Sequence, residues 1–138
     1  VLPGRPTVVL DVAHNPQAAG VLAENLSNMG FYPDTWCVIG MLADKDVEQV
    51  AALLSGRIDH WYVASLQGAR GLDCADLAAR LRAAGVAPEA CFDSPAQAFD
   101  AARKAASESD RILVFGSFMT VADVLGFLED EGKKNARG

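Results

Sequence analysis

Short hydrophobic runs alternate along the chain with longer segments in which apolar positions recur every three or four residues. A short apolar run predicts a buried strand, and the helical spacing predicts an amphipathic helix. Core strands are therefore predicted at residues 7–11, 36–41, 60–65, 90–93 and 111–115. The turn-forming run from Pro3 to Pro6 separates the first of them from a short leading strand at the start of the chain.

The longer segments predict a helix after each core strand, at residues 16–29, 47–54, 74–84, 95–107 and 118–131. Asn15 and Ser94 each precede a proline, and a capping residue followed by proline is a typical helix start. Gly30 and Gly85 stand just after a predicted helix end, where glycine is common. From about residue 132 the chain is expected to be a disordered tail.

Strands that alternate with helices indicate a mostly parallel sheet covered on both faces. We therefore predict an α/β fold, a three-layer Rossmann-like domain with five or six strands. No linker divides the chain, so residues 1–138 are expected to form a single domain. In a parallel sheet the carboxyl ends of the strands share one edge, and ligands bind in the crevice beyond it. The polar loops at 11–16, 41–46, 65–71, 93–95 and 116–120 should meet there.

Composition narrows the class of protein. The formal net charge is −6, which argues against a nucleic-acid partner, because phosphate contacts need clustered Lys and Arg. The cysteines Cys37, Cys74 and Cys91 have no zinc-site spacing and are expected to be reduced thiols. No charged segment followed by an apolar run, as in a secretory signal, occurs in the sequence, and no apolar run approaches the roughly 18 residues of a membrane span. A cytoplasmic monomer without membrane contacts or a metal site of its own is expected.

Several polar side chains in the predicted loops are candidates for chemistry. Asp11 ends an apolar strand and needs a partner, and His14 has no capping duty because Asn15 precedes the helix. Their spacing leaves a structural and a functional role equally open. Ser117 can cap the last helix through its hydroxyl, and Arg70, in a glycine-rich loop, can either bind an anion or stay solvated.

Lys45 lies between Asp44 and Asp46, just before the second helix. Asp46 is expected to cap that helix. Asp44 and Lys45 are either solvated surface residues or part of a site at the sheet edge. A lysine beside this edge would attract a carboxylate or a phosphate.

Three segments together resemble one family: residues 11–16 (DVAHNP), 39–46 (IGMLADKD) and 114–121 (VFGSFMTV). In this order they are similar to motifs of the folylpolyglutamate synthase/dihydrofolate synthase family, relatives of the Mur peptide ligases. The resemblance continues to about Leu128. It covers the C-terminal domain, and no G-x-x-x-x-G-K-[ST] phosphate loop occurs here, so an N-terminal domain is expected to carry it. Family members often have histidine where this chain has Met119.

The resemblance implies an ATP-dependent ligase that joins L-glutamate to dihydropteroate or a folate and releases ADP and phosphate. It implies that Asp11 and His14 contact ATP, with His14 also catalytic, and that Ser117 lies near the glutamate. Lys45 and Arg70 are further candidate glutamate ligands. Mg²⁺ is expected as a cofactor, held mainly by the N-terminal domain. That domain is expected to be a partner, and the fragment alone to be inactive.

Two alternatives remain at this point. One is the C-terminal domain of a Mur peptide ligase, which shares the architecture but acts on a muramyl substrate. The other is a non-catalytic Rossmann-like module that binds a nucleotide or a protein. The combined motif wording favours the folate branch, and the absence of G-x-G-x-x-G gives ordinary dinucleotide binding no support.

Overall fold

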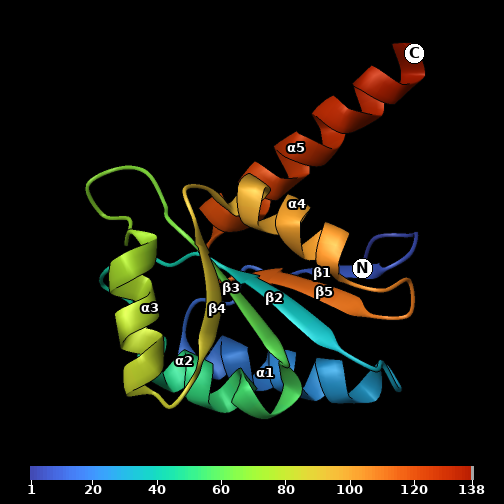
Figure 1. Ribbon diagram of the computed structural model, residues 1–138. Helices are drawn as coiled ribbons and strands as arrows, with labels where there is room; N and C mark the ends of the chain where they lie inside the picture. The colour runs from blue at the N-terminus through green and yellow to red at the C-terminus, as the bar shows by residue number, and fades with distance from the viewer. Residues whose placement is uncertain (138) are drawn as a thin grey trace.

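The structure is a computed structural model that describes residues 1–137, arranged in three layers (Figure 1). Its middle layer is a five-stranded parallel sheet in the order β1-β5-β2-β3-β4. The strands are β1 (Thr7–Leu10), β2 (Thr35–Ile39), β3 (His60–Ala64), β4 (Pro88–Phe92) and β5 (Arg111–Phe115). The predicted α/β fold with a mostly parallel sheet is confirmed.

Helices cover both faces of the sheet (Figure 1). One face carries α1 (Pro16–Asn28), α2 (Val47–Leu54) with the 3-10 turn η1 (Ser55–Arg57), and α3 (Cys74–Ala83). The other carries α4 (Pro95–Ala105) and α5 (Phe118–Arg137). A hydrophobic core lies on each face of the sheet, and alternate residues of a strand belong to different cores. Leu113 and Phe115 of β5 pack against α1 to α3, and Ile112 and Val114 pack on the opposite face.

The predicted caps are present. Asn15, Asp46 and Ser94 precede α1, α2 and α4. The side-chain oxygen of each accepts a hydrogen bond from the main-chain N–H three residues later in the sequence. Each bond satisfies one of the N–H groups that a helix start leaves without a partner. These local signals explain why the helix starts agree with the sequence.

Several predicted boundaries are wrong, among them the end of β2, which lies at Ile39 instead of residue 41. The leading strand is only a single bridge from Leu2 to Val8, because Pro3 and Pro6 lack the N–H that a ladder needs. β4 starts at Pro88 instead of residue 90, which an edge strand tolerates. α5 continues to Arg137, so the segment from 132 is helical where a disordered tail was predicted. Basic residues there favour the helix C-terminus electrostatically.

The carboxyl ends of β2 and β5 touch through two glycines. Gly40 follows β2, and a Cβ on Gly116, which follows β5, would overlap the Gly40 carbonyl oxygen. Gly116 also has a φ of +116°, which side chains disfavour. The buried hydroxyl of Thr120 donates to the same Gly40 carbonyl at 2.8 Å, which ties the first turn of α5 to the end of β2. The loops after β2 and β5 are therefore held together.

We expect Gly116→Ala to lower the free energy of unfolding by about 2–5 kcal/mol, because it adds left-handed backbone strain to overpacking. Gly126→Ala is the matched control, since Gly126 lies within α5 with open space around it. That variant should be stabilised by roughly 0.5–1 kcal/mol. Urea unfolding of both variants measures the difference, and equal stabilities would contradict the packing argument.

The opposite edge of the sheet carries His60, away from the predicted site loops. Its Nε2 lies 2.8 Å from an oxygen of Asp34, its Nδ1 lies 2.6 Å from an oxygen of Glu89, and its ring stacks on Trp36. Burial disfavours the imidazolium, but the hydrogen bonds to Asp34 and Glu89 outweigh burial and raise the pKa of His60 above 6.5. A structural role for His60 agrees with this position.

The protonated His60 should stabilise the fold. Because its pKa is raised on folding, this stabilisation is fully present below the unfolded-state pKa and is lost as the pH rises through the folded-state pKa. Between about pH 6 and pH 8.5 we expect the free energy of unfolding of the wild type to fall by up to about 1 kcal/mol relative to that of His60→Gln, whose side chain at position 60 cannot titrate. Urea unfolding at the two pH values tests this. Parallel pH profiles of the two proteins would show that His60 does not couple to stability.

Candidate functional site

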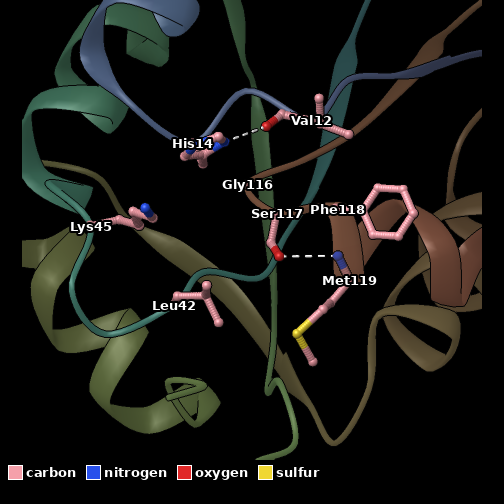
Figure 2. Close-up of a pocket in the computed structure, with 8 residues that line it drawn as sticks. All are labelled: Val12, His14, Leu42, Lys45, Gly116, Ser117, Phe118 and Met119. Atoms are coloured by element: carbon pink, nitrogen blue, oxygen red, sulfur yellow. Dashed lines mark hydrogen bonds between the residues drawn. The ribbon is translucent and has the colours of Figure 1, made fainter.

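A pocket of about 310 Å³ opens at the carboxyl edge of the sheet (Figure 2). Its lining comes from the loops after β1, β2 and β5 and from the first turn of α5: Val12, His14, Leu42, Lys45, Gly116, Ser117, Phe118 and Met119. The structure therefore brings together three of the predicted site residues, His14, Lys45 and Ser117. Asp11 and Arg70 are not among the lining residues.

His14 presents one ring nitrogen that can accept a proton. Its Nδ1 lies 2.9 Å from the carbonyl oxygen of Val12, and a carbonyl only accepts hydrogen bonds. In the neutral ring Nδ1 therefore carries the hydrogen, and Nε2 keeps its lone pair. Asn15 caps α1, which leaves the half-buried His14 side chain at the pocket (Figure 2).

Lys45 supplies a positive charge that the protein leaves available. No carboxylate within residues 1–135 forms an ion pair with its ammonium. The carboxylates beside it in sequence are engaged elsewhere: Asp44 lies 3.3 Å from Arg70, and Asp46 accepts the N–H of Gln49 as the cap of α2. The ammonium of Lys45 is therefore free to bind an anion in the pocket.

Ser117 is 5% exposed, and its Oγ accepts the N–H of Met119 at 3.0 Å. This contact confirms the capping role expected from the Gly-Ser turn. The hydroxyl hydrogen is not used in that contact, so it can be donated to a ligand. The N–H groups in the first turn of α5 add partial positive charge on the same side.

Asp11 and Arg70 lie outside the pocket. The Oδ1 of Asp11 accepts the N–H of Ala13 at 2.8 Å, and Asp11 lines a wide groove of about 380 Å³ with the start of α1. Arg70 has 72% of its side chain exposed and contacts Asp44. The structure therefore does not place the Arg70 side chain with Lys45 and Ser117 in the pocket lining.

Sequence reasoning missed the apolar rim of the pocket. Val12, Phe118 and Met119 are 48%, 73% and 43% exposed. Large apolar side chains in loops beyond strand ends were the available signal, since such positions do not belong to either core. Exposed apolar patches of this kind mark surfaces that another molecule or domain covers.

The described residues form neither a metal-binding cluster nor a membrane-spanning helix. Within residues 1–137 no group of three His, Cys, Asp or Glu side chains is placed to hold a metal ion. The same residues include no helix that is long and apolar enough to cross a membrane. The chemistry of the pocket, with one cation and one imidazole, fits an anionic ligand better than a metal ion.

Solved structures share this fold. Escherichia coli FolC in complex with DHPP and ADP superposes with a TM-score of 0.88 at 39% identity, over 95% of this chain and 30% of that one. A bifunctional folylpolyglutamate synthase/dihydrofolate synthase with Mn, AMPPNP and L-glutamate bound gives 0.84 at 39% identity, over 94% and 30% of the two chains.

Curated relatives agree. The dihydrofolate synthase/folylpolyglutamate synthase of Escherichia coli strain K12 is 40% identical over 136 residues, which are 94% of this chain and 31% of that protein. The Haemophilus influenzae protein of the same name is 37% identical over 127 residues, 90% and 29% of the two lengths. The chain thus spans about a third of the length of these relatives. Residues 2–118 match the family model for the Mur ligase, glutamate ligase domain, and the chain belongs to this family.

Proposed function

We propose that this chain is the C-terminal part of an ATP-dependent ligase that adds L-glutamate to dihydropteroate or to a folate. The observation that carries the proposal is the meeting of an unpaired lysine, an imidazole acceptor and a serine hydroxyl in one pocket. The relatives named above are dihydrofolate and folylpolyglutamate synthases, which favours the folate branch over a Mur peptide ligase.

The glutamate would bind through its carboxylates. Lys45 supplies the opposite charge, the Ser117 hydroxyl supplies a hydrogen-bond donor, and the N-terminal end of α5 adds partial positive charge. One FolC-like structure holds L-glutamate, which is consistent with a site of this kind. Arg70 stays a more distant candidate, because it would have to leave Asp44 and turn toward the pocket.

The reaction then needs a nucleophilic amine. ATP transfers its γ-phosphoryl group to the carboxylate of the pteroate or folate, which gives an acyl phosphate and ADP. The glutamate amine attacks the acyl carbon, the bond from carbon to the phosphate oxygen breaks, and phosphate leaves. The attacking amine loses a proton, and the Nε2 lone pair of His14 is the acceptor that the pocket offers.

Asp11 would contact the nucleotide. Its Oδ1 is engaged by Ala13, and its second oxygen is available to the groove beside α1. A carboxylate oxygen there can accept a hydrogen bond from a ribose hydroxyl. His14 follows on the same loop and lines the pocket, while Asp11 and Asn15 on either side of it in the sequence line the groove, which fits its proposed contact with ATP.

The rest of the enzyme would supply what these residues lack. Mg²⁺, when bound, neutralises phosphate charge during transfer, and its ligands would come mainly from the preceding domain, as would the phosphate loop. The apolar rim of Val12, Phe118 and Met119 is the surface which that domain would cover.

The proposal is tested with the longer enzyme that carries this chain. Phosphate release should require ATP, Mg²⁺, L-glutamate and dihydropteroate or a folate together, and mass spectrometry should show one added glutamate. The 138-residue chain alone should show no turnover above a blank without protein. Phosphate release with a muramyl nucleotide in place of the pteroate would contradict the folate assignment.

Lys45→Met should raise the KM for L-glutamate at least tenfold in the longer enzyme, because tenfold corresponds to about 1.4 kcal/mol of lost attraction. The melting temperature should stay unchanged, since the side chain forms no ion pair within residues 1–135. The control is Lys104→Met, which removes a lysine from α4 that pairs with Asp100. An unchanged KM for glutamate in Lys45→Met would remove Lys45 from the site.

A further inference from the structure

We propose that Arg80 of α3 is a positioning residue for Lys45: it fixes the main chain of the 43–45 loop so that the ammonium stays at the pocket. The inference rests on the proposed function of Lys45 as the cation that binds glutamate. Arg80 itself is not part of the pocket lining, so it would act through Lys45 and not on the substrate.

Arg80 makes four hydrogen bonds with its guanidinium. Nη1 donates to the carbonyl of Ala43 at 3.0 Å, and Nη2 donates to the carbonyl of Lys45 at 2.7 Å. Nε and Nη2 also donate to the two carboxylate oxygens of Glu48, at 2.9 Å and 3.0 Å. The planar fork of arginine can reach all these acceptors at once, which a lysine ammonium cannot.

The bonds from Arg80 complete the support of the loop. Its first half is held by an isolated bridge between Leu42 and Gly71 and by the bond from Ala43 N–H to the Arg70 carbonyl at 2.8 Å. Beyond Ala43 the loop is exposed at Asp44, and the Arg80 bonds to the Ala43 and Lys45 carbonyls hold this second half against α3. The main chain of Lys45 is thus fixed while its side chain stays free.

Arg80 acts by holding the main chain in place and not through its charge, because the carboxylate of Glu48 neutralises that charge. Glu48 contacts the guanidinium through both oxygens, and this hydrogen bonding, against the effect of burial, raises the pKa of Arg80 further above its ordinary value. The cation therefore adds little field of its own at the pocket. Fixing the main chain lowers the entropy that Lys45 loses when it binds an anion.

A purely structural link between α2 and α3 is the competing explanation, and Arg103 provides a matched control for it. Arg103 of α4 has 29% of its side chain exposed, against 28% for Arg80, and it pairs through two nitrogens with Glu131 of α5. It also donates a hydrogen bond to the side chain of Asp100, and its guanidinium lies over the rings of Phe99 and Phe127. Loss of Arg103 therefore costs a similar ion pair without touching the carbonyls of a site loop.

The experiment uses the longer enzyme with the variants Arg80→Ala, Arg80→Lys, Arg103→Ala, Lys45→Met and the double variant Arg80→Ala/Lys45→Met. Arg80→Ala and Arg80→Lys should each raise the KM for L-glutamate at least about fivefold. The KM for ATP should stay within about twofold, and Arg103→Ala should change neither KM by more than that. Adding Arg80→Ala to Lys45→Met should change the glutamate KM less than about twofold, because the residue it positions is gone.

Arg80→Lys keeps a positive charge beside Glu48, so it carries the test even where Arg80→Ala fails to fold. An unchanged glutamate KM in Arg80→Lys, together with a raised KM in Lys45→Met, would overturn the positioning role and leave the proposed function intact. If the fold-changes in glutamate KM of the two single variants multiply in the double variant, the two residues act independently, and this result would also overturn the positioning role. An unchanged KM in Lys45→Met would instead reject the proposed role of Lys45.

Discussion

The close packing of Gly116 against the Gly40 carbonyl is the contact on which the candidate site depends. It joins the ends of β2 and β5, and Thr120 reinforces it with a buried hydrogen bond to the same carbonyl. Because β5 pairs with both β1 and β2, the loops after these three strands become neighbours. A side chain at position 116 would separate them, and the residues that line the pocket would no longer face one another.

Most of the fold could be predicted because the signals are local. Strand and helix positions follow from apolar spacing, and the capping oxygens of Asn15, Asp46 and Ser94 mark helix starts. Strand order could not be predicted in this way, since the last strand, β5, enters between β1 and β2 through packing between distant segments. The end of α5 was also missed, because a charged terminal segment reads equally as solvated helix or as a tail.

The candidate site could be predicted only in part. The loop motifs indicated His14, Lys45 and Ser117, and the structure places all three at one pocket, whereas Arg70 turns outward to Asp44. Arg80 gave no signal, because an arginine on an amphipathic helix reads as a solvated surface residue. Its bonds to loop carbonyls depend on how α3 packs beside α2, which is a tertiary property.

The positive charge of Lys45 stays available for a ligand because the neighbouring carboxylates make other contacts. In a chain of net charge −6, the neighbouring carboxylates bind Arg70 or cap α2 instead of pairing with it. The apolar rim adds to this effect. Two opposite charges 4 Å apart attract by about 1 kcal/mol in water but by about 4 kcal/mol at a partly dry protein surface. On the proposed function, covering Val12 and Phe118 with the preceding domain would therefore strengthen the contact of Lys45 with glutamate, so substrate binding and domain closure would favour each other.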